Sequence, residues 1–194
     1  MRHPLDVPRR ADRHSRQRLQ APRSGSGSPR QWVMIAHCAT AKVPLTGRKG
    51  SVEVVAATLA AALGLSPQAI SYTGKNRFDY LLEVASEEIV RTLQPDMTKL
   101  IAAPTRGVIV TSQSSTPGID FVSRFFAPQV GVPEDPVTGS AHCCLAPYWG
   151  AKFGKERLTG YQASARGGIV RVRMAGERVN IGGQAVTVMR GELL

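Results

Sequence analysis

The chain has 194 residues, enough for one domain of ordinary size or two small ones. Hydrophobic residues make up 42% of it and charged residues 20%, which excludes a chain that is disordered throughout. No run of about 18 uncharged apolar residues occurs, so we expect no membrane-spanning helix and no membrane partner.

The net charge of +11 is concentrated near the N-terminus. Residues 1–50 contain 11 Lys and Arg against two acids, whereas residues 51–194 contain 14 against 12. We therefore divide the chain into an atypical basic segment, residues 1–50, and a domain, residues 51–194. The three cysteines, Cys38, Cys143 and Cys144, form neither a disulfide framework nor a metal-binding spacing. They favour a reducing compartment, the cytoplasm.

The first 30 residues are rich in arginine, proline, serine and glycine. Such a segment buries too little surface to offset its ordering entropy, so we expect it to be disordered. An organelle-targeting segment is a second interpretation, because this start is Arg-rich and acid-poor, although prolines interrupt any long helix. We do not expect nucleic acid as a partner, because no aromatic residue for base stacking precedes Trp32. Residues 31–50 are compatible with a strand that lacks neighbours.

The domain opens with helical and strand patterns in turn. The Ala-rich run 54–63 predicts a helix that ends at Gly64. Ser86 is the expected N-cap of a second helix, which stops before Pro95. Runs of β-branched or alternating apolar residues predict strands at 78–84, 107–111 and 120–126.

The second half of the domain contains a series of strands and one long helix, which is expected to start at Thr138-Gly139-Ser140 and to run through about Phe153. The strands are predicted at 158–163, 168–174, 178–181 and 185–189. Turns between the last three are expected at 175–177 and at Gly182–Gly183. We expect an α+β fold in which a curved, mainly antiparallel sheet wraps around this central helix.

The motif GVPEDPVTGSAH, residues 131–142, is the candidate functional segment. The start of the helix leaves backbone N–H groups unpaired at the positive end of its dipole. Gly139 lets an anion approach the backbone closely, and Ser140 adds a hydroxyl donor, so together they would hold a carboxylate or phosphate. Asp135 would lie beside that anion and transfer a proton.

A purely structural interpretation of the same motif remains open, namely an Asp-Pro turn followed by a Thr-capped helix. His142 is expected to be a core or capping histidine, and Cys143 and Cys144 are expected to pack against the rest of the domain. Adjacent cysteines point to different faces of a helix and cannot hold one metal ion together. The sequence indicates no metal, nucleotide or flavin site.

The runs SRFFAPQVGV, EDPVTGSAHCCLAPYWG and FGKERLTGYQASARGG, followed by RVRMAGERVNIGGQAVTVMRGELL, closely resemble the phenazine biosynthesis PhzC/PhzF-like family. These motifs occur in the family's order, and the chain is similar to its C-terminal lobe. The resemblance implies two lobes like those of diaminopimelate epimerase, of which this chain would hold one and remnants of the other. It also implies a site between the lobes and cofactor-free isomerisation by proton transfer.

On this resemblance, Asp135 matches an active-site acid that contacts substrate. Gly139 and Ser140 match the residues that hold the substrate near its carboxylate. Glu134, Thr138 and His142 receive no direct chemical role. Two arginines, Arg124 and Arg166, are interpreted as structural in preference to anion-orienting.

The chain departs from the family pattern in one respect. It lacks the N-terminal glutamate in a Ser-Glu-Thr-like context, and Ala36–Thr40 only loosely matches the family's Cys-Gly-His-Ala-Thr motif. The function hypothesis is therefore a cofactor-independent isomerase of a small carboxylic acid, in a truncated and inactive form if the glutamate is essential. The alternative is a non-catalytic lobe that binds a ligand or protein. A homodimer could substitute a second copy for the absent lobe.

Overall fold

The structure is a computed structural model that describes residues 31–38 and 49–186, together with residues 189 and 192. The predicted disorder of residues 1–30 lies outside the described residues. The helices are α1 (Lys49–Leu63), α2 (Glu87–Thr92), α3 (Met97–Ile101) and α4 (Gly139–Phe153), with short 3-10 turns η1 (Pro67–Ala69) and η2 (Pro128–Val130). The strands are β1 (Gln31–Cys38), β2 (Ile70–Lys75), β3 (Asp79–Val84), β4 (Gly107–Gln113), β5 (Phe121–Phe126), β6 (Arg157–Gln162), β7 (Gly168–Ala175) and β8 (Arg178–Ala185).

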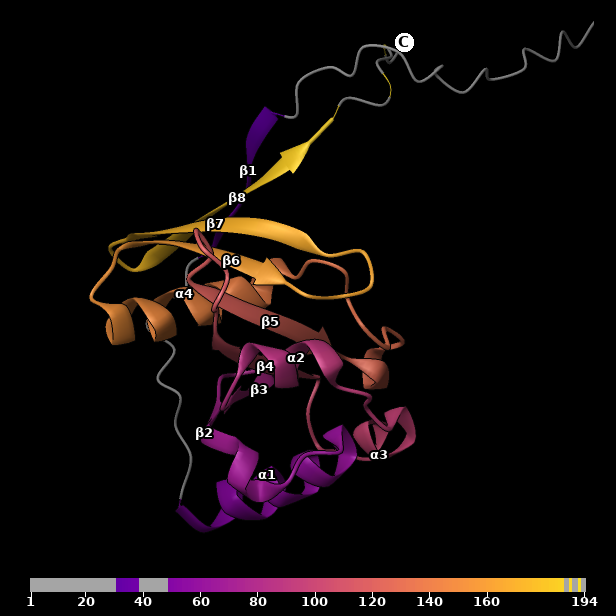
Figure 1. Ribbon diagram of the computed structural model, residues 1–194. Coiled ribbons are helices and arrows are strands. Elements are labelled where there is room, and N and C mark those ends of the chain that lie inside the picture. The colour runs from indigo at the N-terminus through magenta and orange to yellow at the C-terminus, as the bar shows by residue number, and fades with distance from the viewer. Residues whose placement is uncertain (1–30, 39–48, 187–188, 190–191, 193–194) are drawn as a thin grey trace, which may run out of the picture.

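All of these strands join one sheet in the order β1-β8-β7-β6-β5-β4-β3-β2 (Figure 1). The pairs β3–β4 and β5–β6 are parallel, and the other five pairs are antiparallel. Helix α4 packs against β6, β7 and β8. The predicted fold class, a mainly antiparallel sheet around a central helix, is confirmed.

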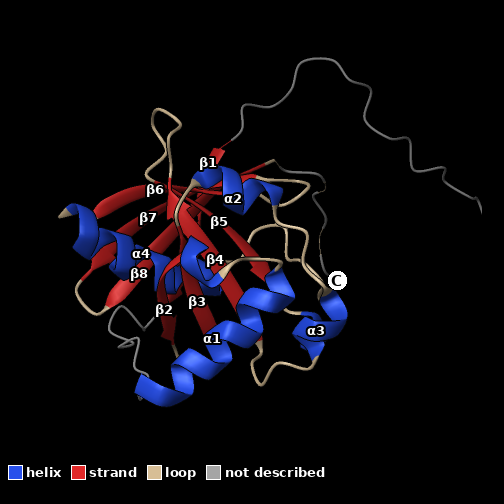
Figure 2. Cartoon of the chain, turned by 60° about the horizontal axis from the view of Figure 1, so that its bottom comes forward, coloured by secondary structure: helices blue, strands red, loops and turns tan. Residues whose placement is uncertain are grey.

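Helices cover the sheet on both faces, and alternate residues of the strands point to each side. On the α4 side, Ile109 and Phe121 pack with Trp149 in one buried cluster. On the other side, Val110 and Val122 pack with residues of α1, α2 and α3 in a second cluster. Figure 2 shows α1, α2 and α3 in front of the strands. Because successive side chains of a strand point to opposite faces, the same strands contribute to one hydrophobic core on each face of the sheet.

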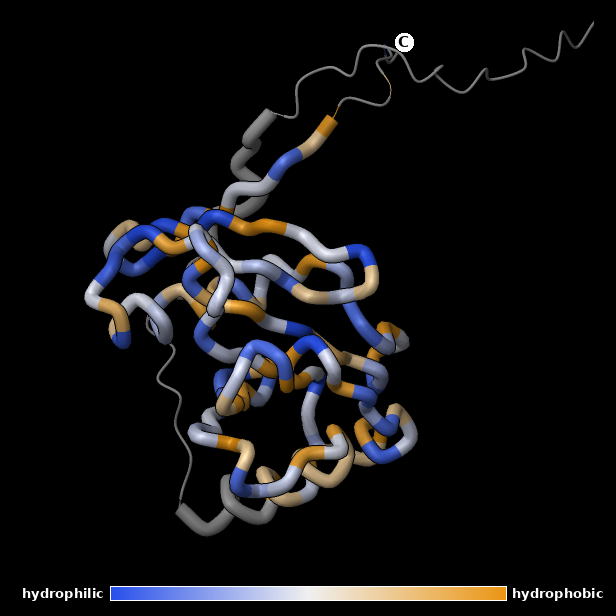
Figure 3. The backbone as a smooth tube through the Cα atoms, in the orientation of Figure 1, coloured by the Kyte–Doolittle hydropathy of each residue, from blue (hydrophilic) through white to orange (hydrophobic). Residues whose placement is uncertain are grey.

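Three findings on single elements differ from the sequence-based expectations. Strand β1 has a neighbour, because it pairs antiparallel with β8. Strand β8 runs through Gly182–Gly183, where a turn was predicted, and both glycines pair with β1. Strand β2 and the five-residue helix α3 were not predicted. Blue and orange segments alternate along β7 and β8 in Figure 3, as expected of strands with one covered face.

Candidate functional site

The predicted motif lies in the segment that connects β5 to α4. After Phe126 the chain turns through η2 and through Gly131, whose φ of 81° is in the left-handed region, and Ala127 forms an isolated bridge with Val132. The N–H of Asp135 then donates to the carbonyl of Phe125 at 3.1 Å, which ties the acid to the end of β5. Helix α4 begins four residues later.

Asp135 and Thr138 are held by a glutamine from β6. The side chain of Gln162 is fully buried. Its Oε1 accepts from the N–H of Thr138 at 2.7 Å, and its Nε2 donates to the carbonyl of Asp135 at 2.5 Å. Nε2 also lies 3.1 Å from Thr138 Oγ1, and that hydroxyl donates to Asp135 Oδ2 at 2.7 Å. The amide of Gln162 therefore fixes both backbone and side chain of the motif.

Thr138 occupies the N-cap position of α4, but its side chain makes no capping hydrogen bond. The predicted Thr-capped helix is therefore wrong in this detail, because the hydroxyl binds Asp135 instead. Around Gly139, nothing lies within 4 Å of the position that a Cβ would occupy. A side chain at position 139 would therefore meet no packing obstacle.

A cavity of about 280 Å³ brings several of these groups together. It is lined by Asp135, Thr138, Ser140, Arg106, Phe125, Ala127, Val130 and Val132. Of the predicted site residues, Asp135 and Ser140 line it, and Gly139 lies between two lining residues of the chain. The lining combines polar side chains with the apolar side chains of Phe125 and the two valines.

Arg106 is a site residue that the sequence did not indicate. Its Nε and Nη2 donate to the carboxylate of Asp79 at 2.8 Å and 2.5 Å, and Asp79 is buried. These hydrogen bonds raise the pKa of Arg106, so the guanidinium stays charged. Its Nη2 also lies 3.5 Å from Ser140 Oγ. The cavity therefore has a fixed cation beside the helix start.

The two candidate arginines outside the motif, Arg124 and Arg166, do not line this cavity. Arg124 binds Glu134 through two hydrogen bonds of 2.7 Å and 3.0 Å and also donates to the carbonyl of Leu93 at 2.8 Å. This confirms the structural interpretation of Arg124. Arg166 is exposed and is not among the residues that line the cavity.

His142 and the two cysteines of α4 belong to the core. His142 is fully buried, and its Nδ1 lies 2.8 Å from the carbonyl of Thr138. Burial lowers the pKa of His142 to about 4, so the ring is neutral near pH 7. Cys143 and Cys144 are buried, and burial raises the pKa of the Cys144 thiol to about 11. The expected core roles of these residues are confirmed.

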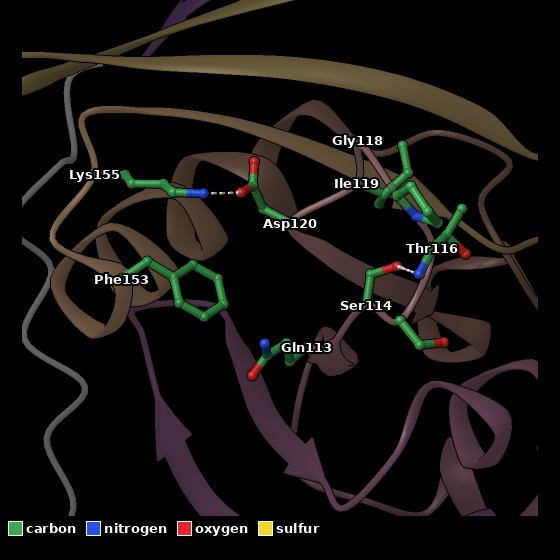
Figure 4. Close-up of a pocket in the computed structure, with 10 residues that line it drawn as sticks. Gln113, Ser114, Thr116, Gly118, Ile119, Asp120, Phe153 and Lys155 are labelled. Carbon is green, nitrogen blue, oxygen red and sulfur yellow. Dashed lines mark hydrogen bonds and ion pairs between the residues drawn. The ribbon is translucent and has the colours of Figure 1, made fainter.

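A second cavity, of about 510 Å³, lies at the opposite ends of β4, β5 and α4 (Figure 4). Several of its polar groups are bonded to one another or to the rest of the protein. Lys155 pairs with Asp120 at 2.7 Å, and Ser114 donates to Glu87 at 2.8 Å. It contains none of the predicted site residues. Within the described ranges, no three His, Cys, Asp or Glu side chains are grouped to hold a metal, and no helix could cross a membrane.

The comparisons identify the family. A model of the phenazine biosynthesis-like protein (PhzC-PhzF) family matches residues 27–191. This chain belongs to the phenazine biosynthesis-like family. The match spans every strand of the sheet, from β1 to β8, so the resemblance found in the motifs is confirmed.

Members of the phenazine biosynthesis-like family with similar sequences include bacterial proteins named as isomerases. An uncharacterized isomerase of Halalkalibacterium halodurans is 53% identical over 132 residues, which are 68% of this chain and 49% of that protein. One from Pseudomonas aeruginosa is 51% identical over 133 residues, with the same two shares. A solved PhzF-family structure from Enterococcus faecalis has a TM-score of 0.61 at 40% identity, over 66% of this chain and 47% of that one. The chain spans about half the length of the curated relatives it matches.

Proposed function

We propose that this chain provides one side of an isomerase site that acts on a small carboxylic acid by proton transfer. Asp135 exchanges the proton, and the start of α4, with Gly139 and Ser140, binds the carboxylate. The observation that carries the proposal is that Asp135, Ser140 and Arg106 line one cavity. The two bacterial relatives are named as isomerases, which supports the same class of reaction.

The polar and the apolar groups of the cavity have separate tasks in this mechanism. The unpaired N–H groups and dipole of α4, the Ser140 hydroxyl and the Arg106 guanidinium all favour a negative charge. A carboxylate bound there places the adjacent carbon near Asp135. Phe125, Val130 and Val132 give the cavity an apolar lining, and a partner surface that covered it would exclude water and strengthen these interactions. Moving a proton between carbon atoms needs acid and base groups only, so the proposal includes no cofactor.

Proton transfer on opposite faces of the reacting carbon would need a second acid or base. Among the described residues that line the cavity, Asp135 is the one carboxylate. This favours a second candidate function, a lobe that binds a carboxylate without catalysis. It also favours a second chain at the site, and we propose a second copy of this chain as that partner. We also propose a cytoplasmic location, which the low cysteine content of the chain supports.

The test is incorporation of solvent deuterium into a panel of small carboxylic acids. We expect the chain to exchange an α-hydrogen of one panel member, detected by NMR. Asp135→Asn should lower the exchange rate at least about 100-fold, since general acid–base groups contribute that much. Glu88→Gln, which changes an exposed acid on α2, is the matched control and should have no effect. Binding of a panel member without exchange would support the non-catalytic lobe instead.

A further inference from the structure

The orientation of the Gln162 side-chain amide follows from its two backbone partners. The N–H of Thr138 can only donate, so the atom 2.7 Å away must be Oε1. The carbonyl of Asp135 can only accept, so the atom 2.5 Å away must be Nε2. The two contacts agree, and a flipped amide would place two donors and two acceptors face to face. The amide is therefore fixed in one orientation.

This orientation sets the direction of the next hydrogen bond. Nε2 of Gln162 has no lone pair to offer, so at 3.1 Å it donates to Thr138 Oγ1. The hydroxyl proton of Thr138 must then point elsewhere. Among the described residues, the acceptor within reach is Asp135 Oδ2, at 2.7 Å. Thr138 is 5% exposed, so its hydroxyl has little contact with solvent.

We propose that Gln162 and Thr138 are positioning residues that reserve Oδ2 of Asp135 as a hydrogen-bond acceptor and leave Oδ1 as the oxygen that exchanges a proton with the ligand. None of the described residues donates to Oδ1. The inference rests on the proposed function, because it states which atom of Asp135 carries that chemistry. It assigns no direct contact with ligand to Gln162, which is fully buried.

The way Thr138 is used argues against a purely structural role. A Thr at the N-cap normally accepts a hydrogen bond from the first turn, which stabilises a helix by about 1 kcal/mol. Thr138 does not do so, although it occupies that position. Its hydroxyl serves Asp135 instead, and the amides at the start of α4 stay available to a ligand. The hydrogen bond to Asp135 and the available amides both favour ligand binding, and neither stabilises α4.

The first test compares Thr138→Val, which removes the hydroxyl at nearly constant shape, with Thr138→Ser, which keeps it. In the deuterium-exchange assay, we expect Thr138→Val to lower kcat roughly 10- to 100-fold through misplacement of the carboxyl group. KM should stay within about twofold, because the carboxylate site is untouched. Thr138→Ser should stay within about threefold of the native kcat, because it keeps the same donor. Equal losses in both variants, or a change in KM alone, would overturn the inference.

The second test does not depend on activity. Neutron diffraction from crystals of the full chain exchanged into heavy water shows where each deuteron lies. We expect a deuteron on Thr138 Oγ1 that points to Asp135 Oδ2, and two on Gln162 Nε2. A deuteron bound to Oδ2, or a Thr138 hydroxyl turned to another acceptor, contradicts the inference. If the chain shows no exchange activity while the deuterons lie as expected, the proposed function fails and the hydrogen-bond direction stands.

Discussion

Two glycines of the site region lack a side chain for different physical reasons. A Cβ on Gly160 would lie 2.5 Å from atoms of the Phe121 ring and 3.3 Å from His142 Nε2, so packing requires glycine there. A Cβ on Gly139 would meet nothing within 4 Å. Packing does not explain Gly139, whereas the proposed access of an anion to the backbone of α4 would.

This contrast predicts that Gly139→Ala separates binding from stability. The midpoint of thermal unfolding should stay constant or rise slightly, because alanine favours a helix over glycine by up to about 1 kcal/mol. Binding of a small aromatic carboxylate, benzoate, should weaken about tenfold in an NMR titration because the new methyl group blocks the approach. Gly160→Ala is the matched comparison and should lose about 1–3 kcal/mol of stability. Unchanged benzoate binding in Gly139→Ala would count against a backbone anion site.

The residues that sequence reasoning missed are those that reach the site from distant strands. Asp135, Gly139 and Ser140 lie in one short motif, and helix-start chemistry made them visible. Arg106 precedes β4, and the pairing of β4 with β5 brings it to the motif. Gln162 is a single amide residue in a strand, and nothing in the neighbouring sequence indicates that it belongs to a site. Its importance depends on β5–β6 pairing and on the turn that precedes α4.

At the scale of single elements, α2 is linked to the loop after β4 through one buried carboxylate. Glu87 accepts hydrogen bonds from the Ser115 N–H at 2.7 Å, from Ser114 Oγ at 2.8 Å and from Arg91 Nε at 2.8 Å. Burial alone would raise the pKa of Glu87, but these hydrogen bonds together lower it to about 2. Ser86, the predicted N-cap, accepts from the Ile89 N–H at 3.3 Å and is confirmed.

The pKa of Glu87 predicts how stability depends on pH. Because the folded pKa lies below the ordinary value of 4.5, this group's stabilising effect is complete above about pH 4.5 and is lost as the pH falls toward about 2. Glu87→Gln should therefore lower the free energy of unfolding by about 1–3 kcal/mol near pH 7, measured with urea. Its difference from the native protein should vanish near pH 2. Glu88→Gln, the exposed neighbour, should show neither effect, and a difference that persists in acid would contradict this assignment.

Elements with strong local patterns were predicted, and those that depend on tertiary context were not. The Ala-rich run of α1 and the β-branched run of β4 have intrinsic preferences that match their structure. Helix α3 has five residues, too few for a periodic signal, and its N-cap Asp96 accepts from the Lys99 N–H. Gly182–Gly183 suggested a turn, but both glycines pair with β1 and Gly182 also pairs with Arg171 of β7, which holds them in β8.

At the scale of the whole molecule, apolar side chains remain exposed around the mouth of the site cavity. Val130 and Val132, which line it, are 56% and 40% exposed, and Phe78, beneath the Arg106 guanidinium, is 49% exposed. Exposed apolar groups gathered at one place favour association with another surface. The proposed second copy would cover them and would close the cavity to water.

We expect the chain to sediment as a dimer at micromolar concentration. Changing both valines, Val130→Ser with Val132→Ser, should shift it to a monomer. The thermal midpoint should change little, since exposed side chains contribute little to folding. The control is Ile169→Ser, on the outer face of β7, where the side chain is 45% exposed. A native chain that sediments as a monomer, or a dimer lost only in the Ile169 variant, would exclude this surface as the contact.

The pairing of β1 with β8 has a consequence for how the fold is reached. Strand β1 ends at Cys38 and its partner begins at Arg178, with the rest of the sheet between them in the sequence. During synthesis at about 5–20 residues per second, the first strand leaves the ribosome on the order of ten seconds before its partner exists. In refolding, the same contact closes the longest loop of the sheet and is therefore expected late. Until that moment β8 has one unpaired edge, and the nascent chain depends on its earlier strands and helices to stay folded.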